Sequence, residues 1–371
     1  MKAFSIDRYG KNNGRLGNLP APEVGDHDVL VRVHAASVNP LDSKISKGEF
    51  KLILPYSFPL VLGHDLAGVV VRVGSGVQQF KPGDEVYARA PDGHIGTFAE
   101  QIAVNENALA VKPASIRMEE AAALPLAALT AWQVLVETAR LKKGQKVFIQ
   151  AGSGGVGTLA IQLAKHLGAF VATSTGTGNV QWVKALGADV VIDYKQQDFT
   201  SVLRDYDVVL NSLGADELEK SLEILRPGGQ LISISGPPTP QFAQAQGFSW
   251  VLRLIMGLLS SGIRRKARRK GVSYTFMFMR ASGPQLREIT PLVEAGILKP
   301  VVDRSFPSTR RPMPWTTSNR GGPRARSSSR STQEWPMSEP GLPAGITKRL
   351  CVNPPEVRSR RTAHHWPGHA G

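Results

Sequence analysis

A glycine-rich loop between an apolar run and an apolar helical pattern limits the fold of this chain most. Residues 146–151 are β-rich and largely apolar, and a GxGxxG pattern follows over residues 152–157. Apolar residues then recur at helical spacing over 156–167. A strand, a tight turn and an open helix N-terminus in this order bind a dinucleotide pyrophosphate through backbone N–H groups. The expected contacts are Gly152, Ser153, Gly154, Gly155, Val156 and Gly157.

The end of the next predicted strand indicates which dinucleotide binds. Folds that prefer NAD usually carry Asp or Glu about 20 residues after the first glycine, on the ribose 2′-hydroxyl. The strand predicted over 170–174 instead runs into Thr, Gly and Asn, and no acidic residue occurs between Gly157 and Asp189. Small hydroxyl residues leave room for a 2′-phosphate and donate hydrogen bonds to it. We therefore predict NADPH, with Ser174 and Thr175 among its contacts; the alternative is an ordinary polar loop.

Length and cysteine content restrict the class of protein. The chain has 371 residues, enough for two domains and a substantial core. No apolar run approaches the roughly 20 residues that span a bilayer. The N-terminal residues run directly into a strand-like pattern without a secretory or transit segment, so we expect a cytoplasmic location. Cys351 is the single cysteine, which excludes a disulfide within the chain and a thiolate zinc cluster, and we expect no metal.

The net charge of +15 is concentrated in two places. Residues 308–371 and the basic run 264–270 carry most of it. No groove-reading motif accompanies them, so we expect no nucleic-acid partner. The apolar segment 247–263 precedes the basic run and is interrupted by Arg253, which makes it too short and too charged to span a membrane. It is either an interfacial anchor or, as we favour, a helix that covers the active-site cleft.

The remaining patterns divide the chain into domains. Residues 1–120 are β-rich with frequent Gly and Pro, which predicts a compact antiparallel domain. A helical pattern begins near residue 118 and should break or kink at Pro125. Strands and helices then alternate over 121–270, which predicts a parallel sheet with right-handed crossovers. Residues 271–307 are expected to return to the first domain.

Seven motifs follow one another along the chain, at residues 37–44, 63–68, 124–132, 152–157, 186–194, 225–229 and 276–283. Together and in this order they resemble the medium-chain dehydrogenase/reductase superfamily. The similarity is greatest to its zinc-independent quinone oxidoreductase branch, including the reticulon-4-interacting protein type. The resemblance implies an α/β chain with a GroES-like β-rich catalytic domain and a Rossmann domain with a doubly wound parallel sheet. It further implies hydride transfer from NADPH to a small quinone or α,β-unsaturated carbonyl, with no metal, and it allows a homodimer.

The resemblance also implies catalytic residues. Reduction of a quinone or enone builds negative charge on a carbonyl oxygen, which requires a preorganised donor. Asn39 and Lys44 are the candidates, with Asp42 orienting them. The alternative for Asn39 is that it only caps a turn before Pro40. His64 matches a zinc-ligand position of metal-bearing relatives, but one ligand makes no site, and we interpret it as structural.

Further cofactor contacts are implied outside the glycine loop. Thr130, expected at the start of the helix that follows the break at Pro125, should contact the nicotinamide or its phosphate, unless it only caps that helix. Tyr194 matches a position near the 2′-phosphate, although a packed aromatic is an equal alternative. Asn179 stands where relatives can carry a lysine, a departure that weakens the NADPH preference. Asn211 and Phe278 complete the expected set.

The C-terminal residues depart from the family pattern. Residues 308–371 are rich in Arg, Pro, Ser and Gly without an apolar period, and we expect a disordered tail. We hypothesise a frameshift at Pro307, which the gene's nucleotide sequence would test. Loss of the family's last helix and strand would leave a sheet edge uncovered and the chain poorly stable. The alternative function is therefore a non-catalytic NADPH-binding or interaction protein.

Overall fold

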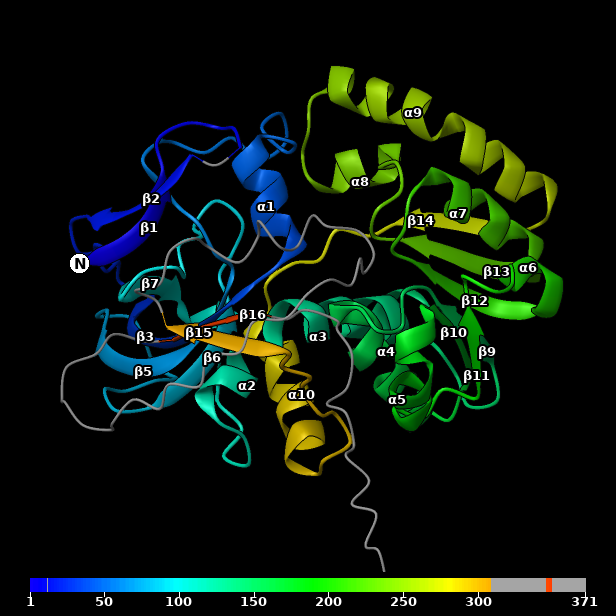
Figure 1. Cartoon of the computed structure of the whole chain (residues 1–371). Coiled ribbons are helices and arrows are strands. Elements are labelled where there is room, and N and C mark those ends of the chain that lie inside the picture. Colours follow the sequence, from blue (N-terminus) through cyan, green and yellow to red (C-terminus); the bar gives the residue numbers. More distant parts are fainter. Residues whose placement is uncertain (12, 308–344, 349–371) are drawn as a thin grey trace, which may run out of the picture.

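The first of two domains is built from antiparallel strands. The structure, a computed structural model, describes residues 1–11, 13–307 and 345–348, and its two domains lie side by side (Figure 1). The first domain holds a small sheet in the order β2-β1-β4 and a larger one in the order β15-β16-β3-β5-β6-β8, with β7 also paired to β3. The bounds are β1 (Lys2–Ile6), β2 (Gly14–Asn18), β3 (Asp28–Val38), β4 (Leu60–Val61), β5 (Asp65–Val73), β6 (Glu85–Arg89), β7 (Gln101–Asn105), β8 (Leu109–Val111), β15 (Arg304–Pro307) and β16 (Gly345–Lys348).

One strand of this domain comes from the tail. Strand β16 pairs in parallel with β3 and antiparallel with β15. The expectation of a wholly disordered tail is therefore wrong for Gly345–Lys348. The ladder of hydrogen bonds on β3 explains the difference, because an open edge pairs with any extended backbone that reaches it. The rest of the tail lies outside the described residues.

The second domain contains the predicted parallel sheet. All neighbouring pairs in it are parallel, in the order β11-β10-β9-β12-β13-β14. This is the strand order of a Rossmann fold. The last strand begins at Ser273, so the expected domain boundary at residue 270 is too early. The bounds are β9 (Lys146–Ile149), β10 (Phe170–Thr175), β11 (Val190–Asp193), β12 (Tyr206–Asn211), β13 (Leu225–Ser233) and β14 (Ser273–Phe276).

Helices cover both faces of this sheet (Figure 1). Alternate residues of β9 face opposite ways: Val147 and Ile149 belong to a core with α3, α4 and α5, whereas Phe148 belongs to one with α6, α7 and α9. The sheet is therefore doubly wound, as expected. The helices are α1 (Pro40–Lys47), α2 (Met118–Ala122), α3 (Pro125–Trp132) with a π-helical turn at Gln133–Thr138, α4 (Gly155–His166), α5 (Val180–Ala185), α6 (Phe199–Val202), α7 (Ala215–Lys220), α8 (Pro240–Ala245), α9 (Trp250–Arg269) and α10 (Gly283–Glu294).

Two helices differ from their sequence predictions. Pro125 starts α3, and the break lies before it, because proline fits the first helical turn, whose N–H groups lack partners anyway. Thr130 is consequently inside α3 and not at a helix start. The apolar segment forms α9, which packs on α8 and β14 of the second domain. No helix among the described residues is long and apolar enough to cross a membrane.

Candidate active site

The glycine loop joins β9 to α4, as predicted. Helix α4 has Gly154 at its N-cap position, and no side chain caps it. The N–H groups of its first turn have no partner inside the helix and are left for an anion. Loop residues 153–156 are partly exposed, so a ligand can reach them. Before the loop, Ala151 has a φ of 51°, a conformation that costs a non-glycine residue energy and recurs at functional sites.

The loop fits a pyrophosphate only because its glycines lack side chains. A Cβ on Gly157 would lie 2.3 Å from the Ala151 carbonyl oxygen and 2.8 Å from the Gly152 Cα. A Cβ on Gly152 would lie 2.1 Å from the Thr173 hydroxyl on the next strand. These contacts are shorter than atoms tolerate, so the loop closes tightly only with glycine at both positions. The geometry agrees with the roles of these glycines in dinucleotide-binding loops.

The predicted hydroxyl residues lie at the carboxyl end of β10. The backbone carbonyl of Ser174 accepts a hydrogen bond from Gly152 N at 2.8 Å, which ties β10 to the glycine loop. The hydroxyl of Thr175 is buried and has no hydrogen-bond partner among the described residues. A buried hydroxyl without a partner is costly, so Thr175 fits a polar group of a ligand at this point.

An acidic residue also reaches this region, although sequence spacing did not indicate it. Asp193 ends β11 and pairs in register with Thr175. Burial acts to raise the pKa of Asp193, but hydrogen bonds from Thr177, Lys195 and Gln196 outweigh it and lower the pKa below its usual value. The carboxylate is therefore ionised, and its oxygens are occupied by Lys195 N at 3.0 Å and Gln196 Nε2 at 2.9 Å. These bonds order the turn after β11.

That turn places two further side chains beside the end of β10. A Cβ on Gly176 would lie 3.3 Å from the Tyr194 hydroxyl and 3.7 Å from Cε of Lys195. Tyr194 is 64% exposed, which contradicts the alternative of a packed aromatic. Lys195 is exposed and was not among the predicted residues. Asn179 accepts a bond from Trp182 Nε1 at 2.9 Å, which leaves its amide N–H groups as donors.

Asn211 has a supporting position in this structure. It is fully buried at the end of β12. Its Nδ2 donates to Gln150 Oε1 at 2.7 Å, and its Oδ1 accepts from the Ser233 hydroxyl at 2.7 Å. The amide thus joins the ends of β9, β12 and β13, and we expect it to hold the glycine loop in place.

Two of the three predicted catalytic residues, Asn39 and Asp42, lie in a buried polar cluster at the start of α1. Asp42 accepts Asn39 N at 2.7 Å on one carboxylate oxygen, and its other oxygen lies 2.6 Å from His64 Nδ1. His64 Nε2 has no partner within the described residues. Asp42 thus fixes the start of α1 through the backbone N–H of Asn39, and no bond to Lys44 accompanies it among the described residues. Lys44 lies further along α1 and is exposed.

Asp65 holds this cluster together, although it is not among the residues predicted from the sequence. Its Oδ2 accepts the Asn39 side-chain amide at 2.9 Å and the Ser37 hydroxyl at 3.2 Å. Its Oδ1 accepts Leu126 N, in the first turn of α3, at 2.9 Å. Burial raises the pKa of Asp65 to about 6, although the bond from Asn39 and the charge of His64 act in the opposite direction. The signal was present, since Asp65 follows His64 in a family motif.

Helix α3 connects this cluster to the cofactor half of the site. It packs against α4, the helix that follows the glycine loop. Thr130 is buried in α3, and its hydroxyl donates to the Leu126 carbonyl at 2.7 Å. Thr130 therefore does not cap a helix start. It lies one turn after Leu126, the residue that binds Asp65, and its contact with the cofactor stays a prediction.

A set of aromatic rings connects the two domains. The Phe278 ring, after β14, lies with its centroid 6.0 Å from that of Phe50, which follows α1. Phe242 of α8 lies 6.0 Å from Phe278 on another side and 5.0 Å from Phe276. Phe278 thus contacts aromatic rings of both domains, and these surroundings favour an apolar, planar ligand.

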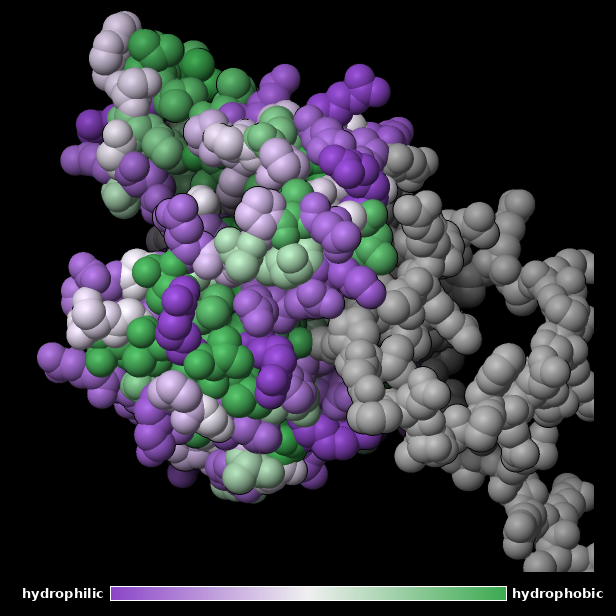
Figure 2. All heavy atoms as spheres, turned by 90° about the vertical axis from the view of Figure 1, so that its left-hand side faces the viewer, coloured by the Kyte–Doolittle hydropathy of each residue, from purple (hydrophilic) through white to green (hydrophobic). Residues whose placement is uncertain are grey.

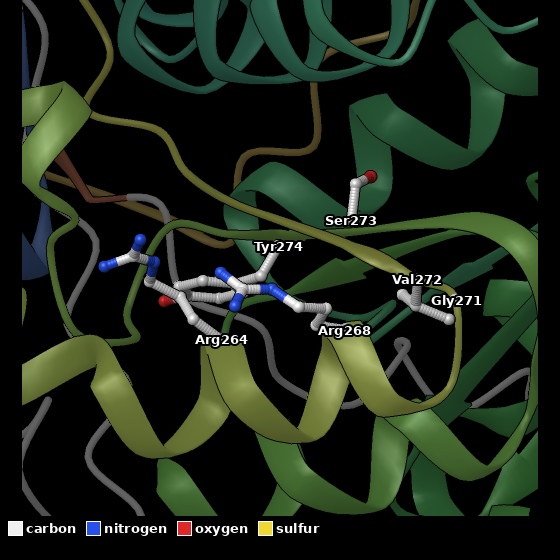
Figure 3. Close-up of a pocket in the computed structure, with 6 residues that line it drawn as sticks. All are labelled: Arg264, Arg268, Gly271, Val272, Ser273 and Tyr274. Carbon is white, nitrogen blue, oxygen red and sulfur yellow. The ribbon is translucent and has the colours of Figure 1, made fainter.

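A separate hollow lies at the edge of the parallel sheet opposite the glycine loop. Arg264 and Arg268 of α9 border it together with Tyr274 at the start of β14 (Figure 3). It has a volume of about 370 Å³ and is open to solvent. The start of β14 belongs to the amino edge of the parallel sheet, whereas the glycine loop follows the carboxyl end of β9. The hollow is therefore not part of the dinucleotide site.

Two protein families match this chain. The description "Alcohol dehydrogenase GroES-like domain" matches residues 25–114, and "Zinc-binding dehydrogenase" matches residues 186–312. The second name refers to a metal. Within the described residues, no group of three or more His, Cys, Asp or Glu side chains could hold a metal ion.

Curated relatives and solved structures agree with these matches. The chain is 36% identical to the 2-methylene-furan-3-one reductase of Solanum lycopersicum (83% of this chain, 72% of the relative). It is also 36% identical to the chloroplastic NADPH-dependent alkenal/one oxidoreductase of Arabidopsis thaliana (83% and 73%). It is 34% identical to the mitochondrial NAD(P)H oxidoreductase RTN4IP1 of Homo sapiens (88% of each).

Among structures, the Escherichia coli quinone oxidoreductase complexed with NADPH has a TM-score of 0.68 at 26% identity, over 82% of this chain and 90% of that one. An alcohol dehydrogenase superfamily protein from Novosphingobium aromaticivorans has a TM-score of 0.74 at 29% identity, over 94% and 99%. The chain therefore belongs to the medium-chain dehydrogenase/reductase superfamily, beside its quinone oxidoreductases.

Proposed function

We propose that this protein is an NADPH-dependent oxidoreductase that transfers a hydride to a quinone or an α,β-unsaturated carbonyl without a metal ion. One observation carries the proposal. Asp65 binds the Asn39 amide and the first turn of α3 at once, and α3 packs on the helix of the glycine loop. A hydrogen-bond donor for the substrate is thereby linked rigidly to the cofactor site. The names of the relatives point to the same chemistry.

One group of residues binds the cofactor, and another binds the substrate. Backbone N–H groups of the glycine loop hold the pyrophosphate, and Thr175, Tyr194 and Lys195 hold the 2′-phosphate. NADPH, when bound, supplies the hydride. Asn39 keeps one amide N–H on Asp65 and offers the other to the carbonyl oxygen, where negative charge grows during reduction. Asp65 is a positioning residue, since it acts through Asn39.

The alternative is a protein that binds NADPH without catalysis. Protein and NADPH are mixed with a quinone or with an enone, and loss of NADPH absorbance is followed. The oxidoreductase consumes NADPH with at least one acceptor and does so equally after treatment with a chelator. Tight NADPH binding, with no loss of NADPH absorbance in the presence of either acceptor, would establish the alternative. Loss of activity on chelation would contradict the metal-free mechanism only.

Two expectations remain predictions of this proposal. We expect a cytoplasmic location, although relatives carry the words chloroplastic and mitochondrial in their names. Cell fractionation tests it, and recovery in an organelle would overturn it. The resemblance also allows a homodimer, and the mass measured by sedimentation equilibrium would show whether one forms.

A further inference from the structure

The outer face of α9 is unusually apolar for a surface helix. The described residues include fourteen exposed large hydrophobic side chains, and six of them lie in the first half of this helix. Trp250 is 76% exposed and Leu258 is 67% exposed. A patch of exposed apolar side chains of this size marks a contact site on a protein surface. The six are Trp250, Val251, Leu254, Ile255, Leu258 and Leu259.

These residues share one face of the helix. They recur at four-residue intervals in two neighbouring rows, as a helical stripe requires. The opposite face carries the contacts with the protein, through buried Met256, Ile263 and Ala267. In Figure 1, α9 runs along the outside of the second domain, with α8 and β14 on its inner side. The hydrophobic cap at the top of Figure 2 stands at the height of this helix.

The second half of α9 continues the same face with positive charge. Arg265 and Arg269 follow Leu258 by about two and three turns, so they extend the apolar stripe. The run 264–270 contains six basic and no acidic residues. Among the described residues, Lys266 alone in this run has an ion pair, with Glu219 at 2.5 Å. Arg264 and Arg268 project into the open hollow beside Tyr274 (Figure 3).

We propose that this face of α9 docks on an anionic membrane surface. The apolar half enters the boundary between headgroups and acyl chains, and the basic half lies over the lipid phosphates. Trp250, at the exposed end of the stripe, has the amphipathic ring that favours such a boundary. The hollow between Arg264 and Arg268 provides a place for one phosphate group.

Charge distribution favours a membrane over a second copy of this chain. In a two-fold dimer through this face, the two α9 helices could pack in parallel. Their basic halves would then face each other and repel. Helices in antiparallel orientation would place each basic half against an apolar half. Either arrangement leaves cations without counter-charges, whereas an anionic bilayer offers an apolar layer and negative charge together.

Vesicle flotation tests the proposal with the full chain. Vesicles contain phosphatidylcholine alone or phosphatidylcholine with phosphatidylserine. The protein should float with the anionic vesicles, and added salt should weaken that binding. Leu254→Gln with Leu258→Gln should reduce binding about tenfold or more. Arg265→Gln with Arg269→Gln should reduce binding to anionic vesicles about thirtyfold, from the attraction expected for two cations.

Matched controls separate α9 from the rest of the surface. Leu52→Gln with Val202→Gln removes two exposed apolar residues elsewhere, and Arg72→Gln with Arg287→Gln removes two exposed cations; neither pair should change binding. The tail is also basic, so vesicle binding by the wild type does not by itself support the proposal. Support comes only from weaker binding of the two α9 double variants. Unchanged melting temperatures show that the variants fold.

Two results would overturn the docking surface. One is flotation that the α9 pairs leave unchanged. The other is absence of flotation with a shift from dimer to monomer in the leucine pair, which would assign this face to a second copy.

Discussion

The side-chain amide of Asn39 donates a hydrogen bond of 2.9 Å to the carboxylate of Asp65, and this bond aligns the candidate active site. Both groups are buried, and Asp65 also accepts the backbone N–H of Leu126. The N-cap residue of α1 is thereby fixed relative to α3, which packs on α4 of the cofactor domain. The relationship leads to two predictions about catalysis and pH.

Asn39→Ala should lower kcat by on the order of 10²-fold, because the donor for the developing oxyanion is lost. The Kd for NADPH should stay within about twofold, since the glycine loop is untouched. Steady-state kinetics and NADPH titration measure both. Asn107→Ala, at an exposed asparagine, is the matched control. If Asn39 only supports α1, its replacement lowers the melting temperature and leaves kcat near wild type.

Asp65 should make stability depend on pH. Burial raises its pKa in the folded chain to about 6, above the usual value near 3.9 of an unfolded chain. The folded state therefore holds the proton more tightly, and this stabilisation is complete below about pH 4 and is lost as the pH rises through about 6. This rise in the pKa corresponds to a change of about 3 kcal/mol in the free energy of unfolding across that pH range.

Asp65→Asn removes this titration, so wild type should lose about 3 kcal/mol relative to the variant between about pH 4 and 7. Urea unfolding at a series of pH values measures the difference. Asp216→Asn, at an exposed carboxylate, should run parallel to wild type. If the free energy of unfolding of Asp65→Asn also runs parallel to wild type across this pH range, Asp65 does not have a raised pKa in the folded state.

Gly157→Ala should abolish NADPH binding. Its Cβ would meet the Ala151 carbonyl oxygen at 2.3 Å, which forces the loop open or moves α4 away from β9. Gly214→Ala adds the same methyl group where nothing lies within 4 Å, and it should bind NADPH like wild type. Fluorescence titration with NADPH compares the two variants. Equal affinities would show that the cofactor does not use this loop.

Lys195→Gln should raise the Kd for NADPH by about tenfold and leave that for NADH unchanged. The reason is that the lysine stands beside Gly176 and contributes a charge to the 2′-phosphate only. Lys184→Gln removes an exposed cation from nearby α5 and serves as the control. Equal losses for NADPH and NADH would place Lys195 outside the phosphate site.

The local patterns of the sequence were sufficient for most of the fold. Strand, glycine loop and α4 occur where the periodicity placed them, and the parallel sheet is confirmed. Prediction failed at details that depend on neighbours, such as the start of α3 at Pro125 and the inclusion of β14 in the sheet. For the site, the family motifs indicated Asn39 and Asp42 but not the bond of Asp65 to Leu126.

The sequence alone determined which segments form strands and helices and which loop receives a pyrophosphate, because these properties depend on residues a few positions apart. Tertiary structure decided which distant residues meet. It brings Lys195 to Gly176, Asp65 to α3 and Phe50 to Phe278, and it turns one face of α9 outward. Such contacts depend on how whole elements pack, and packing leaves no regular interval in a single sequence.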